Sequence, residues 1–186
     1  NETVVGKLQV AAGPHAGAVK KSLFYYGPAK FPAAYGAFDT DKWESWTAWD
    51  EKAAGDLGRA YNYPHVAIGH WVLYRTARNH PGLVKRHDWR WYLDKAYQTA
   101  GAMMRDAPYY AEFGLMEGDV FVDILKDLKR EGLTAQATEM ERLMKGRADH
   151  WRTLQYPFGS EMPWDSTGQP EVYAWMRYFG FEPQAE

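Results

Sequence analysis

Apolar and polar positions follow helical spacing from Pro64 to the end of the chain. Apolar side chains recur there every three or four residues, and each run is bounded by residues that start or stop helices. The spacing predicts helices over residues 65–79, 89–106, 119–131, 134–154 and 170–179. Short connections predict two antiparallel hairpins, 65–79 with 89–106 and 119–131 with 134–154, while the fifth helix looks like half of a third hairpin.

Individual residues mark several of the predicted helix ends. Asp88 is expected to cap the second helix, and Gly132 is expected to end the third. Thr134 is expected to cap the fourth, and Ser166 with Gln169 has the spacing of a capping box before the fifth. These end signals agree with the ranges that the apolar spacing predicts.

Residues 1–58 have a different character, because Gly, Pro and Ala are frequent in them. Short β-like runs at Val4–Val10 and Ser22–Tyr26 are separated by turn formers. We therefore predict a mainly α protein. Its loop-rich N-terminal segment, with at most a short β-hairpin, is expected to pack on a helical-hairpin segment over residues 59–186.

The composition is that of a globular protein, with 46% hydrophobic and 25% charged residues among 186, enough for one domain with a core. The formal net charge is −2 and Lys and Arg are spread out, so nucleic acid is not an expected partner. No run approaches the ~20 apolar residues of a membrane span. There is no cysteine, which excludes disulfides and thiolate metal sites.

Sequence motifs for cofactors and metals are missing. No Gly-rich phosphate loop, HExxH pair, EF-hand loop or GxSxG elbow occurs, and the six His lack metal-site spacing. We therefore expect no cofactor and no metal. The chain starts at Asn1 without an apolar signal region, so we expect a processed or excised piece.

Aromatic residues make up 16% of the chain, and many stand beside carboxylates in three loop segments. A sugar ring has a C–H face that stacks on an aromatic plane, and hydroxyl groups from which carboxylates accept hydrogen bonds. The first segment supplies both with Trp46, Trp49, Asp50 and Glu51. The alternative is a Trp-rich packing segment with solvated acids.

The second segment, residues 59–65, leads directly into the first predicted helix. Arg59, Tyr61, Asn62 and His65 would therefore be held on a rigid base at the start of that helix. His65 is expected to transfer a proton or donate to a hydroxyl group. Equally, His65 is a possible capping residue and Asn62 a possible turn former.

The third segment, residues 159–171, surrounds Trp164 with three acids and one amide. Glu161, Asp165 and Glu171 suggest hydrogen bonds to hydroxyl groups, or a general acid and base pair, and Gln169 is a further substrate-binding candidate. Part of the segment has a structural explanation, since its end suits the first turn of a helix.

Glycoside hydrolysis needs two carboxyl groups, about 5–5.5 Å apart for retention and about 6.5–9.5 Å apart for inversion. Acids from separate loops meet this requirement more readily than neighbours in sequence. We expect Asp50 or Glu51 to face Glu161 or Asp165. Glu117 is a further candidate from a fourth loop, although an acid before a helix is often structural.

The runs Trp49–Glu51, Gly58–His65 and Trp164–Gln169 resemble an uncharacterised family of large secreted bacterial and fungal proteins. That family is in turn similar to six-hairpin, (α/α)6-toroid glycosidases, and the resemblance covers most of residues 43–186. It implies a secreted protein with an acidic, aromatic-lined sugar cleft at one end of the inner helices. By this resemblance the cleft is lined by Asp50, Glu51, Tyr61, His65, Glu161, Trp164 and Asp165.

A closed toroid has twelve helices, and this chain is expected to have five. The chain is therefore expected to be part of a longer polypeptide or to need a companion chain. Our first hypothesis is a glycoside hydrolase segment acting through Asp50, Glu161 and Asp165. The alternatives are a polysaccharide lyase using Tyr61, His65 and Arg59, and a carbohydrate-binding or scaffold module without catalysis.

Overall fold

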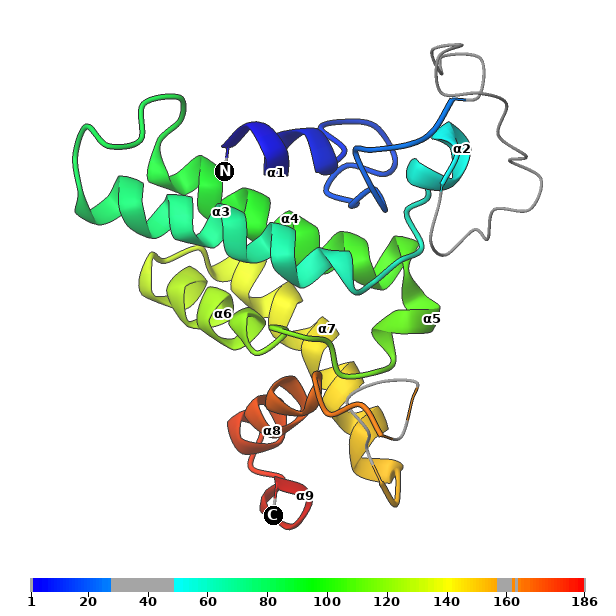
Figure 1. Ribbon diagram of the computed structural model, residues 1–186. Coiled ribbons are helices and arrows are strands. Elements are labelled where there is room, and N and C mark those ends of the chain that lie inside the picture. Colours follow the sequence, from blue (N-terminus) through cyan, green and yellow to red (C-terminus); the bar gives the residue numbers. More distant parts are fainter. Residues whose placement is uncertain (1, 28–48, 157–161, 163, 186) are drawn as a thin grey trace.

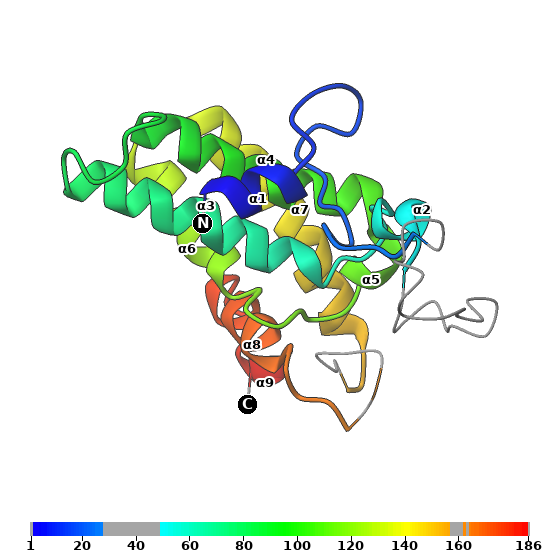
Figure 2. The same cartoon turned by 45° about the horizontal axis from the view of Figure 1, so that its top comes forward.

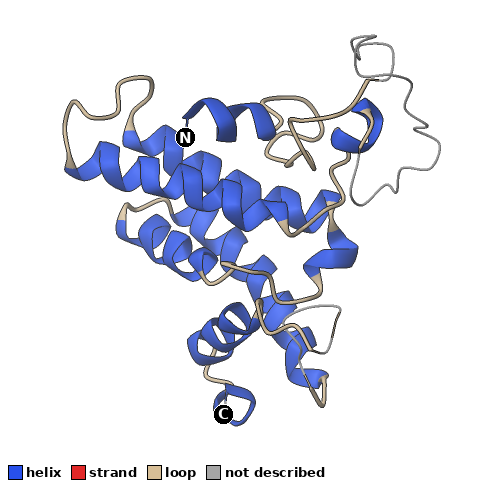
Figure 3. Cartoon of the chain, viewed as in Figure 1, coloured by secondary structure: helices blue, strands red, loops and turns tan. Residues whose placement is uncertain are grey.

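The structure is a computed structural model that describes residues 2–27, 49–156, 162 and 164–185 (Figure 1). Helices dominate it, and no strand occurs within these ranges (Figure 3). The helices are α1 (Glu2–Leu8), α2 (Glu51–Ala54), α3 (Asn62–Asn79), α4 (Trp89–Asp106), α5 (Pro108–Ala111), α6 (Val120–Arg130), α7 (Thr134–Thr153), α8 (Gln169–Tyr178) and α9 (Glu182–Ala185). The prediction of a mainly α fold is confirmed.

Two antiparallel helical hairpins form the body of the molecule, as the sequence predicts. Helices α3 and α4 lie side by side, and α6 with α7 forms a second pair packed beneath them (Figure 1). Helix α6 shows why they assemble: Phe121, Ile124, Leu125 and Leu128 are fully buried, while most of its charged side chains are exposed. Each such side chain contributes roughly 1.5–3 kcal/mol by leaving water.

The local end signals of α4 and α6 act as predicted. Asp88 caps α4, because its Oδ1 accepts a hydrogen bond of 2.8 Å from the Trp91 amide. Gly132 ends α6 with a φ of 71°, and the next amide, that of Leu133, reaches back to the Leu128 carbonyl at 2.9 Å. Left-handed backbone of this kind favours glycine.

Two predicted caps are wrong. Thr134 is the first residue of α7 and not its cap; the N-cap is Leu133, and no side chain bonds to that end. Ser166 and Gln169 form no capping box, because α8 begins at Gln169 and has the buried Gly168 as N-cap. Gln169 thus stands at the first helical position, where its side chain cannot reach back as a capping box requires.

The predicted β-like run at Val4–Val10 is also wrong, since most of it lies in α1. Val5 packs directly on Gly69 of α3, where an added Cβ would lie 2.5 Å from the Val5 Cγ1 atom. This close contact between two helices overrides the strand preference of β-branched residues. Ser22–Tyr26 contains no strand either, and sheet-like pairing is limited, in the described part, to an isolated bridge between Gln9 and Val19.

Helix α1 lies across the α3–α4 hairpin (Figure 2). The segment that follows α1 is hydrogen-bonded to α4. The Gln9 side chain donates to Thr99 Oγ1 at 2.7 Å and to the Lys95 carbonyl at 3.0 Å. Gly17 has a φ of 87°, and a Cβ there would lie 2.6 Å from the Gln98 carbonyl oxygen. A glycine is therefore required at this contact.

We predict that Gly17→Ala lowers the free energy of unfolding by about 2 kcal/mol or more, through strain and a backbone clash. Gly13→Ala is the matched control, since Gly13 has a similar φ of 86° but open space around it. The free energy of unfolding of the control is expected to fall by only about 1 kcal/mol. Urea unfolding of both variants measures the difference, and equal losses would contradict the close contact with α4.

None of the helices in the described ranges is long and apolar enough to cross a membrane.

Candidate functional site

Aromatic side chains gather where α3 begins, beside α5. The Tyr61 and Tyr110 rings lie 5.5 Å apart, and Tyr109 contacts both Tyr110 and Phe113 edge to face. The guanidinium of Arg59 lies 5.5 Å from the Tyr61 ring centroid. We call Tyr61, Tyr109, Tyr110 and Phe113 the aromatic cluster. Tyr109 is 65% exposed, so part of the cluster is open to a ligand.

His65 and Glu117 form an exposed hydrogen-bonded pair near the aromatic cluster. His65 stands one helical turn after Tyr61, so the two side chains share a face of α3. Its Nδ1 lies 2.9 Å from Glu117 Oε2, and the two side chains are 48% and 52% exposed. The pair therefore joins the start of α3 to the loop between α5 and α6.

The backbone of Glu117 is left-handed, with a φ of 61°. For a residue with a Cβ this conformation costs roughly 1–2 kcal/mol. Such strain persists where the surrounding structure enforces it, and it is concentrated at functional sites. The strain at an exposed carboxylate marks Glu117 as the strongest functional candidate of this end of the molecule.

We predict that Glu117→Gly leaves the free energy of unfolding unchanged or raises it by up to about 1 kcal/mol, because glycine adopts this φ without strain. Thermal unfolding of the variant and the wild type tests this. A loss of more than about 1 kcal/mol, the size of a typical hydrogen bond, would mean that the contact with His65 holds the fold.

The first predicted segment has its own local structure. Asp50 caps α2, because its Oδ1 accepts a 2.7 Å hydrogen bond from the Ala53 amide. Glu51 is exposed in the first turn of α2, and Lys21 lies 4.9 Å above the Trp49 ring. No hydrogen bond or ion pair between described residues joins Asp50 or Glu51 to the His65–Glu117 pair. Trp46 lies outside the described residues.

Asn62 has a structural task within the second segment. Its side-chain amide donates to the carbonyls of Lys20 and Lys21, at 3.1 Å and 2.7 Å. These bonds fix the N-terminal segment to the start of α3. Asn62 therefore positions the backbone next to the aromatic cluster, and its amide is already engaged.

The third predicted segment is split between surface and core. Trp164 is 80% exposed, and Asp165 Oδ1 accepts a 2.9 Å hydrogen bond from the Thr167 amide, which forms a local turn. Gln169 is exposed at the first position of α8. Glu161 lies outside the described residues. The expected meeting of this loop with Asp50 therefore stays a prediction.

Glu171 requires a correction, because its side chain is fully buried and does not line a surface. It forms an ion pair with Arg147 of α7, in which Arg147 Nη2 lies 3.0 Å from Glu171 Oε2. The same oxygen accepts a 2.8 Å hydrogen bond from the Leu115 amide. The carboxylate thus holds the loop that carries Glu117.

Arg147 and Glu171 together form a buried anchor for this loop. Arg147 Nε donates to the Ala111 carbonyl and Arg147 Nη2 to the Phe113 carbonyl, both at 2.8 Å. Gly118 is required beside it, since an added Cβ would lie 2.3 Å from the Glu171 carboxyl group. One buried ion pair therefore holds the first half of the loop between α5 and α6 by hydrogen bonds and packs closely against Gly118 near its end.

A family model describing a family of unknown function (DUF5695) matches residues 1–186. The chain belongs to this family. No curated protein and no solved structure gives a significant match. Within the described part of this DUF5695 member, no group of three or more His, Asp or Glu side chains is arranged to hold a metal ion.

Sequence reasoning missed two parts of the site. Tyr109 and Tyr110 follow Pro108, between the predicted helices 89–106 and 119–131. Two adjacent tyrosines outside a predicted helix were the available signal for an aromatic cluster. Arg147 falls three residues after Met144 and four before Trp151, on the buried stripe of α7. An arginine at such a position demands a buried acid as partner.

Proposed function

We propose that this chain supplies a carbohydrate-binding surface to a glycoside hydrolase-like protein, at the end of the molecule where α3 begins. The observation that carries the proposal is the exposed His65–Glu117 pair, which has a strained backbone at Glu117 and lies close to the aromatic cluster. Glu117 lies on a loop that the helices position, and His65 lies in the first turn of α3.

The chemistry of this surface suits a sugar. The exposed Tyr109 offers a ring on which the C–H face of a sugar can stack, and Glu117 offers a carboxylate to accept hydrogen bonds from its hydroxyl groups. His65 can donate or accept on the same face. A ligand held between ring and carboxylate is oriented by both, and this is what recognition of a particular sugar requires.

Hydrolysis would proceed by carboxylate general acid and base catalysis, with Glu117 as one of the two groups. Asp50, Glu161 and Asp165 remain the proposed candidates for the second. The antiparallel pairing of α3 with α4 and of α6 with α7 supports the resemblance to six-hairpin glycosidases. In that reading further helices come from a longer, secreted polypeptide or from a companion chain.

A polysaccharide lyase is the second candidate, favoured by the contact between Arg59 and Tyr61 with His65 one turn away. A lyase needs a base and a cation that neutralises the uronic acid carboxylate. The Tyr61 hydroxyl is buried, however, and among the described residues it has no hydrogen-bond partner. A buried hydroxyl is poorly placed to remove a proton from a substrate, so hydrolysis is the better supported chemistry.

We predict that the chain binds oligosaccharides on a glycan array, and that Glu117→Gln weakens binding roughly tenfold through loss of a charged hydrogen-bond acceptor. Asp123→Asn is the matched control, because Asp123 is an exposed carboxylate on α6. It is expected to leave binding unchanged. Absence of binding to every glycan would overturn the proposal.

Product analysis with an oligosaccharide that binds on the array distinguishes a hydrolase, a lyase and a binding module. New reducing ends without ultraviolet absorption indicate a hydrolase, and unsaturated products that absorb in the ultraviolet indicate a lyase. Binding without any cleavage, in the chain and in a longer polypeptide that contains it, indicates a binding or scaffold module.

A further inference from the structure

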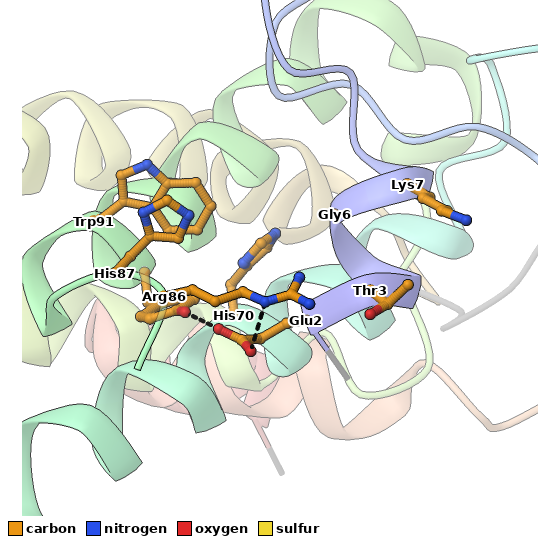
Figure 4. A pocket seen from close by; sticks show the side chains of 9 residues that line it. Glu2, Thr3, Gly6, Lys7, His70, Arg86, His87 and Trp91 are labelled. Carbon is orange, nitrogen blue, oxygen red and sulfur yellow. Dashed lines mark hydrogen bonds and ion pairs between the residues drawn. The ribbon is translucent and has the colours of Figure 1, made fainter. Parts of the chain in front are cut away.

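A pocket of about 280 Å³ lies between α1 and the α3–α4 hairpin (Figure 4). Helix α1 forms one side, where Gly6 leaves open space beside the backbone. The opposite side is formed by the stacked rings of His87 and Trp91, whose centroids are 3.8 Å apart. Its size is just below the range of about 300–1,000 Å³ for small-molecule sites, which suits a small ligand.

The pocket is separate from the candidate sugar surface. His70 lines it, and His70 follows His65 by five positions on α3, which turns the two side chains about 140° apart around the helix. One histidine therefore faces Glu117 and the other faces α1. A ligand in this pocket would be distinct from one held by the aromatic cluster.

His70 is the unusual feature of this pocket. Its side chain is 1% exposed, and both ring nitrogens are buried without a hydrogen-bond partner in the described part of the chain. A neutral imidazole has one donor and one acceptor, and leaving such groups unsatisfied in the interior is unfavourable. Figure 4 shows the ring between α1 and the His87–Trp91 stack.

The ring of His70 is fixed and neutral. An edge contact with Trp91, at 6.0 Å between centroids, holds its plane. Burial, followed by the charge of Lys95, lowers the pKa of His70 to about 4. At neutral pH the imidazole therefore keeps an N–H that it can donate without being itself a cation.

Positive charge exceeds negative charge around the pocket. Arg86 and Lys7 line it together with one carboxylate, that of Glu2. The Arg86 Nε lies 3.6 Å from Glu2 Oε2, which is longer than a hydrogen bond, while the other Glu2 oxygen accepts from the Tyr92 hydroxyl. Arg86 thus retains hydrogen-bonding capacity toward an anion.

We propose that this pocket binds a small carboxylic acid that carries a ring. The carboxylate accepts hydrogen bonds from the Arg86 guanidinium and, after a local shift that uncovers a buried ring nitrogen, from the His70 N–H. The ring of the ligand lies between the His87–Trp91 stack and the bare backbone at Gly6. Aromatic acids and sugar acids share this chemistry.

The experiment is a titration of the chain with benzoate and with D-glucuronate, followed by the ¹⁵N signals of the His70 ring. Benzamide and D-glucose are the neutral counterparts. At least one of the two acids is expected to shift the His70 signals and to bind roughly tenfold or more tightly than its neutral counterpart, because its hydrogen bonds are charge-assisted. Benzoate binding alone identifies an aromatic acid, and glucuronate binding alone identifies a sugar acid.

Two variants test the residues. His70→Phe is expected to weaken acid binding roughly tenfold, while the Tm stays the same or rises, because an apolar ring replaces unpartnered polar atoms. Arg86→Gln is expected to weaken acid binding similarly, and Arg90→Gln, at an exposed arginine outside the pocket, is expected to leave it unchanged. The proposal is overturned if neither acid shifts the His70 signals, if a neutral counterpart binds as tightly, or if His70→Phe binds with full affinity.

Discussion

Replacement of Glu171 by alanine is expected to lower the free energy of unfolding by about 3–5 kcal/mol, because it leaves the buried Arg147 charge without its partner. Both side chains are almost completely inaccessible to solvent, and the carboxylate also accepts from the Leu115 amide. The loop that carries Glu117 loses its anchor at the same time. Urea unfolding of the variant and the wild type measures the effect.

An exposed ion pair provides the matched control for this loss. Arg177 and Glu182 pair at the surface with side chains about half exposed. Glu182→Ala is expected to cost less than about 1 kcal/mol. In the double variant Arg147→Met with Glu171→Leu, part of the loss is expected to be recovered, since no buried charge remains. The rest is expected to persist, because the backbone groups of Ala111, Phe113 and Leu115 lose their partners. A loss for Glu171→Ala no larger than that for Glu182→Ala would contradict the anchoring role.

Acidification from pH 7 to pH 4 is expected to remove about 3 kcal/mol of stability through His70 alone. Its pKa is lowered from 6.5 to about 4 in the folded protein, mainly by burial. Between these values the unfolded chain binds a proton that the folded chain does not, so stability falls as the pH falls. Below about pH 4 both states are protonated and the contribution of His70 no longer changes.

The comparison with His70→Phe isolates this effect. Asp106, Glu139 and Glu141 have pKa values below their ordinary range, through hydrogen bonds to Arg105, Arg142 and Lys129 respectively. These carboxylates therefore lose stabilising interactions at low pH in both proteins. Urea unfolding at pH 7, 5 and 4 measures the free energy of unfolding of both proteins. The gap between wild type and variant in this free energy is expected to change by about 3 kcal/mol from pH 7 to pH 4. An unchanged gap would mean that the His70 ring is solvated or partnered.

The helices predicted well from sequence are those whose signals are local. Both ends of α4 agree with the prediction, because apolar spacing sets its length and the Asp88 side chain bonds to an amide three positions on. Gly132 ends α6 through its own left-handed backbone. Such features depend on neighbouring residues alone, and spacing reveals them.

The features that sequence reasoning missed depend on distant contacts. Helix α1 forms because Val5 fits against Gly69, more than sixty positions away, and its own residues favour a strand. Glu171 was expected at the surface because acids usually are, and its partner Arg147 lies 24 positions earlier. Glu117 was identified as a candidate from its loop, but the strain and the bond to His65 required the fold.

The most direct test of the proposed sugar surface is a titration of the isotope-labelled chain with the oligosaccharide selected on the array. Glycan-dependent shifts are predicted at His65, Tyr110 and Glu117, with His70 unaffected, and they should be strongly reduced in Glu117→Gln. Shifts concentrated elsewhere, or equal shifts in Glu117→Gln and the wild type, would contradict a carbohydrate site at the start of α3.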